Sequence, residues 1–408
     1  MSGDAGVMAS PGLAAGVKLG TPAYRRINLA LFCAGFVTFV TLYDVQPLLP
    51  LFAREFGVVP AVASLPLSIA TVALALGMLL AGTVSESVGR RPLMGAALVL
   101  TSLLAMATWF SHSFASLLLV RLAQGLVLAG IPSVAMAYLG EEMDAHAIAG
   151  AMGLYISGNA IGGMTGRIGS ALLCDHLPWH TAIALIGMLS LGASLVFLRC
   201  LPPSANFQRR PFRLGYLFSS LYRQLCDPGL LCLYLLAFLT MGGFVSLYNY
   251  IGFRLLAPPY GLSQFGVSLI FLVYLLGSFS SGVVGSLINR FGRPFMIRLT
   301  LATMLAGTLL TLAAPVALIV VGVGIFTCGF FCAHAIASSW VGRRARSGRA
   351  QASSLYLFCY YLGSSISGTL GGMFWQQFGW QGVAAMIGML VLAAFGVATL
   401  LLRLPAAE

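Results

Sequence analysis

Charged residues are scarce in this chain, and acidic residues are the scarcest of them. Of 408 residues only 8% are charged, ten are Asp or Glu, and 59% are hydrophobic. Such a composition cannot enclose one water-soluble core without exposing large apolar surfaces. The sequence also lacks the G-x-S-x-G, HExxH and GxxxxGK[ST] patterns of hydrolases, metalloproteases and P-loop ATPases. A soluble protein, an enzyme and an ATP-driven pump are therefore disfavoured, and no cofactor is expected.

Long apolar runs make up most of the chain. At about 20 residues per span they predict twelve membrane helices and leave little room for a soluble domain. Residues 1–26 form a tail without the charged start, apolar core and cleavage site of a signal peptide, so we expect the first span to persist in the mature protein. The expected spans are 27–52, 60–84, 93–110, 114–138, 148–173, 179–201, 230–257, 266–288, 295–314, 316–340, 349–374 and 380–404.

Basic residues give a net charge of +12, which in a soluble protein would suggest a nucleic-acid partner. Most of them gather before the first span, after the last one, and in the loops that follow spans 2, 6, 8 and 10. The positive-inside bias then places both termini in the cytoplasm and leaves no need for a nucleic acid. The eight cysteines are scattered. Cys328, Cys332 and His334 lack a carboxylate nearby, so packing is favoured over a metal site.

The sequence repeats itself at an offset of about 200 residues. The segment from Gly82 to Pro92 and the segment from Gly285 to Pro294 share the pattern Gly-x6-Gly-Arg, and Leu154-Tyr155 and Trp179 recur 201 residues later. We therefore predict a tail (1–26), a first half (27–201), a cytoplasmic linker (202–229) and a second half (230–408), the last ending in a short cytoplasmic tail.

These motifs resemble the major facilitator superfamily, and within it the bacterial twelve-span drug/proton antiporter-like permeases. The resemblance rests on Gly-x6-Gly-Arg-Arg-Pro, on Arg121-x-x-Gln124-Gly125 and on Tyr43-Asp44 in the first span. It implies an all-α polytopic membrane protein of two pseudo-symmetric six-helix bundles in the inner membrane. One departure is Gly158-Asn159, where the family has Gly-Pro, and this weakens any inference of transport direction from span 5.

Asp44 is the one carboxylate well inside an expected span. Counting 1.5 Å per residue from the span ends puts Asp44 and Arg121 at a similar depth, so they can meet. A transporter that changed their separation would change the affinity of the carboxylate for a proton. A permanent structural ion pair is the alternative. Arg167 could share Asp44, or it could extend toward Asp175 at the membrane surface.

Polar and aromatic residues on the inward faces of spans 1, 4, 7 and 10, which line the pathway in this family, are the candidates for substrate selection, together with two residues of span 5. The alternative for His334 is a satisfied core histidine. The candidates are Tyr43, Gln46, Gln124, Tyr155, Asn159, Tyr248, Asn249, Tyr250 and His334.

The repeated loop motif suggests a cytoplasmic gate, with a plain topology signal as the alternative. Gly89 suits a tight turn, we expect Arg90 and Arg91 to remain in water, and the resemblance gives Glu86 a role in the gate. The gate candidates are Gly82, Glu86, Gly89, Arg90, Arg91, Gly285, Arg290, Gly292 and Arg293.

Small residues spaced by three or four in span 5 predict close helix packing. The helix-packing candidates are Gly158, Gly162, Gly163 and Gly166. A further interpretation is a seal or sliding surface between the halves, with Gly363, Gly368, Gly371 and Gly372 as the partner stripe.

The sequence thus predicts a proton-coupled secondary transporter that works by alternating access. Efflux of a small organic molecule by proton antiport is preferred, import of an organic acid or sugar by proton symport is the alternative, and a sensor or channel is a remote one. The expected partners are a small-molecule substrate, a proton and the lipid bilayer, and the transporter is expected to act as a monomer.

Overall fold

A computed structural model describes residues 16–144, 146–207, 214–345 and 348–405. The first part of the tail and the basic residues Arg209, Arg210, Arg213 and Arg346 lie outside these ranges. The described residues form helices joined by short loops, and their one extended pairing is a single bridge between Val17 and Met143. In the first half the elements are α1 (Pro22–Tyr43), η1 (Gln46–Leu48), α2 (Leu49–Glu55), α3 (Pro60–Ala63), α4 (Leu65–Val88), α5 (Arg90–Ala107), η2 (Thr108–Phe110), α6 (Phe114–Leu128), α7 (Pro132–Glu142), α8 (Ile148–Cys174) and α9 (Trp179–Cys200). The later elements are α10 (Leu214–Leu225), α11 (Pro228–Leu256), α12 (Gln264–Ser268), η3 (Leu269–Val273), α13 (Tyr274–Phe291), α14 (Arg293–Leu310), α15 (Val316–Arg344) and α16 (Arg349–Arg403).

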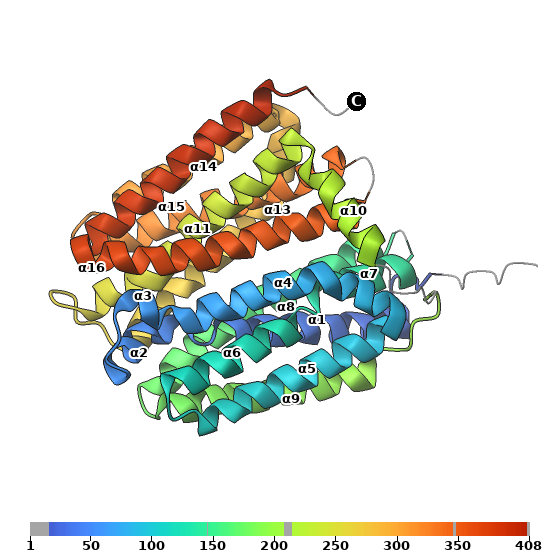
Figure 1. Ribbon diagram of the computed structural model, residues 1–408, viewed down its shortest axis with the longest axis horizontal. Coiled ribbons are helices and arrows are strands. Elements are labelled where there is room, and N and C mark those ends of the chain that lie inside the picture. The colour runs from blue at the N-terminus through green and yellow to red at the C-terminus, as the bar shows by residue number, and fades with distance from the viewer. Residues whose placement is uncertain (1–15, 145, 208–213, 346–347, 406–408) are drawn as a thin grey trace, which may run out of the picture.

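The helices gather in two groups, α1 to α9 below and α11 to α16 above in Figure 1. The groups lie side by side along α4 and α16, and α3 also contacts α16. We call the end that carries Arg90, Arg293 and Arg344 the basic side, and the end that carries α2 and α3 the opposite side.

Nine helical segments in the described part of the chain are long and apolar enough to cross a membrane. One of them is α16, which contains two of the expected spans and is interrupted at Gly379, where φ is 58°. The helices α8 and α14 coincide with expected spans but are not among the nine. Large apolar side chains such as Phe279 and Leu119 are exposed, as expected for a lipid-facing surface. The count of twelve spans stays a prediction.

Several of the expected continuous spans are interrupted, among them span 2, which is divided between α3 and α4. The span predicted over 27–52 consists of α1, η1 and α2, and its regular helix ends at Tyr43. Span 4 is divided between α6 and α7, and span 8 between α12, η3 and α13. Interrupted helices leave backbone groups free at membrane depth, and these groups must find partners elsewhere in the protein.

The glycines of α8 pack against α1 in the same group. A Cβ atom added to Gly158, Gly162 or Gly166 would lie 2.3 to 2.4 Å from a carbonyl oxygen of α1, so the prediction of tight packing fits this contact. The α8 stripe therefore faces α1 and not the glycines of α16, whereas Gly372 of the α16 stripe lies against Ala61 of the first group. In the second group Gly363 approaches the carbonyl of Phe238 in α11 in the same way.

We expect Gly162→Ala to lower the stability of the protein. The added methyl would meet the Phe36 carbonyl oxygen at 2.3 Å, and overpacking of this kind costs about 1–3 kcal/mol. Gly169→Ala is the matched control on the same helix, because a Cβ there meets nothing within 4 Å. The melting temperatures of the two purified variants in detergent test this, and equal values would contradict the packing argument.

Two ion pairs on the basic side each join helices of one group. Arg90 pairs with Glu141 at 2.7 Å, and Arg344 pairs with Asp227 at 2.7 Å. Partial burial alone would raise the pKa of Asp227, but hydrogen bonds from Arg344 and from the amides of Leu230 and Gly229 hold that pKa below its usual value. Within the described ranges no ion pair links the two groups on this side.

Candidate functional site

Asp44 lies where the first span is interrupted. It directly follows the last residue of α1, and its side chain is completely buried. Pro47 lies in the short η1 helix just beyond it, and proline cannot continue the backbone hydrogen bonding of α1. The carboxylate is therefore placed beside the free carbonyl groups at the C-terminus of α1.

Arg121 of α6 approaches this break and contacts both Asp44 and the carbonyls. Its Nη1 lies 3.1 Å from Asp44 Oδ1 and also donates to the Thr41 carbonyl at 2.8 Å, while Nη2 donates to the Leu42 carbonyl at 2.5 Å. Nε donates to the carbonyl of Pro66 at 3.2 Å. One buried guanidinium thus pairs with the carboxylate and satisfies the end of α1.

The second oxygen of Asp44 is buried, and no described residue donates a hydrogen bond to it. Gln124 also belongs to this cluster, because its Oε1 accepts a 2.9 Å bond from Arg121 and its Nε2 donates to the Thr101 carbonyl at 3.4 Å. Gln124 is completely buried here, so in this conformation it supports Arg121.

Arg167 contacts neither of its two expected partners. Its Nε donates to Gln46 Oε1 at 2.7 Å and its Nη1 to the Gly163 carbonyl at 2.9 Å. The expectations of a shared Asp44 and of an extension toward Asp175 are both wrong, because the guanidinium turns into the protein, above the ring of Tyr43. It is 3% exposed.

Gln46 continues this polar contact into the second group. Its Nε2 donates to Asn249 Oδ1 of α11 at 2.8 Å, while the amide nitrogen of Asn249 is buried without a partner among the described residues. The chain Arg167, Gln46, Asn249 therefore crosses between the groups near the opposite side.

The remaining pathway candidates lie among aromatic residues. Tyr248 shares a 2.8 Å hydrogen bond with Thr327, and Tyr250 donates to the Gly368 carbonyl at 2.6 Å. His334 lies 3.0 Å through Nδ1 from the hydroxyl of Tyr356. This hydrogen-bond partner fits the alternative expectation of a satisfied core histidine.

Tyr155 and Asn159 on α8 face α1. The Oδ1 atom of Asn159 packs against Gly35, and this atom and the Tyr155 hydroxyl are buried without hydrogen-bond partners within the described part of the chain.

Sequence reasoning missed a row of hydroxyl groups between α4 and α16. Thr71 Oγ1 lies 2.7 Å from Ser365 Oγ, and Ser68 Oγ lies 3.0 Å from Thr369 Oγ1. Ser64 reaches the same threonine at 3.3 Å. The sequence pattern that could have predicted this row is the spacing of Ser64, Ser68 and Thr71, which places small hydroxyl residues on one helix face.

The gate candidates lie on the basic side, and one expectation fails there. Gly89 and Gly292 have φ angles of 111° and 78°, as tight turns at these loops require. Arg90 does not remain in water: it is buried, forms a close hydrogen bond with Ser85, and pairs with Glu141 about fifty residues further on. Arg91 is half-buried and donates to the Leu198 carbonyl at 3.0 Å.

The other gate candidates show no contact between the groups. Glu86 is half-buried and takes part in none of the ion pairs of the described residues. Arg290 lies over the ring of Phe291, and Arg293 Nε is buried without a hydrogen-bond partner in the described ranges. A Cβ added to Gly82 or Gly285 would meet nothing within 4 Å.

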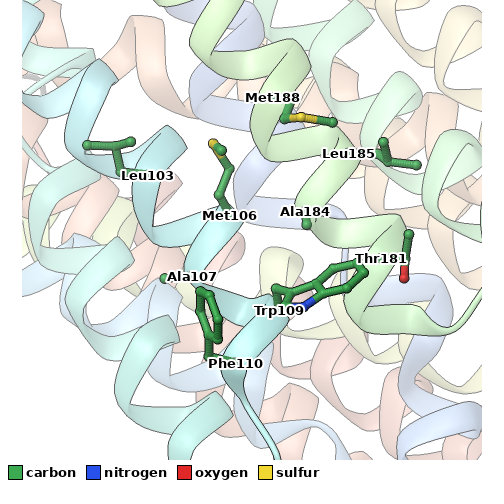
Figure 2. Close-up of a pocket in the computed structure, with 9 residues that line it drawn as sticks. All are labelled: Leu103, Met106, Ala107, Trp109, Phe110, Thr181, Ala184, Leu185 and Met188. Carbon is green, nitrogen blue, oxygen red and sulfur yellow. The ribbon is translucent and has the colours of Figure 1, made fainter.

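A pocket of about 430 Å³ lies away from all of these residues, between α5 and α9 (Figure 2). Apart from Thr181 its lining is apolar or aromatic, and Trp109 and Phe110 are exposed at 49% and 74%. Exposed aromatic side chains at helix ends are typical of the membrane interface. We therefore assign this pocket to the lipid-facing surface. Its lining residues are Leu103, Met106, Ala107, Trp109, Phe110, Thr181, Ala184, Leu185 and Met188.

Comparisons with known proteins agree on one family. The sequence profile described as Major Facilitator Superfamily matches residues 28–368 and 256–408. The uncharacterized MFS-type transporter YybF of Bacillus subtilis is 49% identical over 387 residues, which cover 95% of this chain and 96% of that protein. The inner membrane transport protein YnfM of Escherichia coli is 46% identical over 387 residues, 95% of this chain and 93% of that protein.

A solved structure shares the fold. The bacterial homolog of the human lysosomal transporter Spinster, in an inward-facing and occupied conformation, superposes with a TM-score of 0.73 at 13% identity, covering 94% of this chain and 98% of its own. The chain therefore belongs to the major facilitator superfamily, and it is a multi-pass membrane transporter rather than an enzyme.

Proposed function

We propose that this protein is a proton-coupled secondary transporter that exports a small organic molecule by antiport and works by alternating access. The two halves, 27–201 and 230–408, rock about a site between them, and the linker 202–229 joins them. The basic side faces the cytoplasm, as the positive-inside bias suggests, and one chain is the functional unit.

The position of the contacts between the two groups supports alternating access. The hydrogen bonds between α4 and α16, the Gln46 to Asn249 bond, and the bond from the Phe265 amide to Asp175 all lie toward the opposite side. On the basic side, a Cβ atom added to Gly82 or Gly285 would meet nothing within 4 Å. With the proposed orientation, this conformation is closed to the outside.

The observation that carries proton coupling is the burial of Asp44 with only one of its oxygens paired. An uncompensated carboxylate oxygen at membrane depth is unfavourable, and a proton on that oxygen would remove the charge. Arg121 competes with the proton because it stabilises the ionised form. A change in their separation during rocking would then load and release a proton.

The same contacts also fit a permanent structural pair, because Arg121 satisfies three backbone carbonyls besides Asp44. The two hypotheses differ in what Asp44→Asn does. A coupling role predicts loss of proton-driven accumulation with exchange intact, whereas a structural role predicts loss of folded protein or no change in coupling.

We expect Asp44→Asn to abolish substrate accumulation driven by a pH gradient. A thermal-shift screen of organic anions, neutral compounds and cations first selects the substrate. Everted membrane vesicles, with the basic side outward and an acidic interior, then measure its uptake. One proton per substrate lets a gradient of one pH unit support about tenfold accumulation. The variant should show none, but should still exchange labelled for unlabelled substrate.

Glu55→Gln is the matched control, because Glu55 is an exposed acid at the end of α2 on the opposite side and should leave accumulation unchanged. Exclusion of substrate from the acidic interior would indicate symport instead of antiport. Wild-type accumulation in the Asp44→Asn protein would refute the coupling role.

A further inference from the structure

Arg167 is a buried cation without an anion. Within the described residues no carboxylate lies within ion-pair distance of it, and Asp44 is already paired with Arg121. A guanidinium at membrane depth without a counter-charge is unfavourable, and such residues usually serve a transported ligand or an ion pathway. Arg167 takes no part in the proposed proton exchange between Asp44 and Arg121.

Aromatic rings surround the guanidinium. Its carbon lies 4.0 Å from the ring centre of Tyr43, 4.7 Å from that of Tyr274 and 5.1 Å from that of Phe271. Cation–π contacts offset part of the lost hydration while leaving donors available. The hydrogen bonds to Gln46 and Gly163 use Nε and Nη1, and none formed with a described residue uses Nη2.

A second donor lies beside it. The hydroxyl of Tyr274 is buried beside the Arg167 guanidinium, and it forms no hydrogen bond of normal geometry with any described residue. A buried hydroxyl without a partner is costly unless a ligand engages it. A planar carboxylate can accept hydrogen bonds from a guanidinium and from a phenol hydroxyl at the same time. The two oxygens of a carboxylate match the spacing of the guanidinium N–H donors especially well.

A row of aromatic side chains leads from Arg167 toward the basic side. Ring centres are 5.8 Å apart from Tyr274 to Phe331, 5.6 Å from Phe331 to Phe330, and 6.2 Å from Phe330 to His334. Phe331 and His334 of this row are half-buried, whereas Tyr274 and Phe330 are buried, as are Tyr43 and Phe271 at the closed end. A flat molecule entering between the groups would meet rings along its path and the cation at the end.

We infer that Arg167 and Tyr274 bind the carboxylate of a planar organic monoanion, whose apolar body stacks on the aromatic row formed by Tyr274, Phe331, Phe330 and His334. This inference rests on the proposed function, since it assumes that the substrate passes between the two groups. It narrows the substrate class to organic acids. A cation would be repelled by Arg167, and a neutral molecule would leave its charge uncompensated.

Three probes of nearly equal shape test the charge preference at equilibrium. Benzoate, benzamide and benzamidine share one ring and a planar head group but carry negative, no and positive charge. We expect calorimetry on the purified full-length protein to give a benzoate affinity at least about tenfold above those of the other two, as one charge-assisted pair predicts.

Variants locate the site. Arg167→Gln should remove the preference for benzoate, Arg167→Lys should retain part of it because the charge remains without the paired donors, and Tyr274→Phe should weaken benzoate binding severalfold. Arg54→Gln is the charge-matched control, because Arg54 is exposed on the opposite side. It should bind benzoate like the unaltered protein. If Arg167→Gln does not fold, Tyr274→Phe and Arg167→Lys still decide the question.

Equal affinities for the three probes, no detectable binding of any of them, or full benzoate binding by Arg167→Gln or Tyr274→Phe would overturn the inference. The assay uses no proton gradient, so its outcome is separate from that of the Asp44→Asn experiment. If proton coupling is refuted but benzoate is still preferred, the anion site is supported without the coupling. If benzoate is not preferred but Asp44→Asn abolishes accumulation, the coupling is supported without the anion site.

Discussion

A disulfide between cysteines at positions 71 and 365 is expected to stop transport. The hydroxyl oxygens of Thr71 and Ser365 are 2.7 Å apart, across the interface between α4 and α16. Disulfides need Cβ atoms roughly 3.5–4.5 Å apart, which residues with hydroxyls in contact can provide. Because alternating access requires this interface to separate, the link would hold the protein in one state. Exchange and accumulation should both fall to the background of empty vesicles.

The cross-linked protein should recover when a reductant is added, and Thr71→Cys or Ser365→Cys alone should transport normally under oxidising conditions. Ser102→Cys with Ser194→Cys is the matched control, because these hydroxyls lie 3.2 Å apart within the first group. Its disulfide should leave transport unchanged. Full activity of the protein linked at 71 and 365 would mean that α4 and α16 do not part during the cycle.

The hydroxyl row also explains why this interface can open. Each Ser and Thr there makes only a few neutral hydrogen bonds across the groups, each worth about 0.5–1.5 kcal/mol net, and water can replace them. The α1–α8 contact is different, since glycine against carbonyl backbone leaves no space for adjustment. Polar contacts between the groups and close backbone packing within a group together favour rigid halves that move as units.

Sequence reasoning predicted the helical membrane fold because hydrophobic runs and loop charges are local features. It missed the interruptions at Asp44, between α6 and α7, and in span 8, because those runs remain apolar across each break. Pro47 and Pro132 were the local signals, but proline occurs in continuous membrane helices too. The first break is stable because Arg121 donates to the freed carbonyls, and this contact is visible only in the structure.

The pairing of Asp44 with Arg121 was predictable from the sequence, whereas the partners of Arg167 and Arg90 were not. Counting residues along two helices brought Asp44 and Arg121 to one level, and the structure pairs them at 3.1 Å. The surroundings of Arg167 depend on how η3 and α13 of the second group meet α8, which no pattern in the chain specifies. Likewise, the partner of Arg90 is Glu141, an acid in the last turn of α7, so burial of that arginine follows from tertiary contact alone.

Replacement of Arg121 by methionine is expected to destabilise the protein strongly. The guanidinium is completely buried and donates to Asp44, Gln124 and the carbonyls of Thr41, Leu42 and Pro66. Removing one partner of a buried ion pair costs about 3–5 kcal/mol, because the other charge is left uncompensated. A large fall in the melting temperature of the purified protein, or a loss of folded protein on expression, should follow.

A double variant separates the two roles of Arg121. Replacing both members of a buried ion pair with apolar residues is often tolerated, so Asp44→Leu with Arg121→Met should recover the part of the loss that comes from the uncompensated carboxylate. The carbonyls of Thr41 and Leu42 would remain without a donor, and each unsatisfied buried group costs about 1–3 kcal/mol. We therefore expect partial recovery. Full recovery would show that Arg121 does not stabilise the broken end of α1, and no recovery would show that capping outweighs the ion pair.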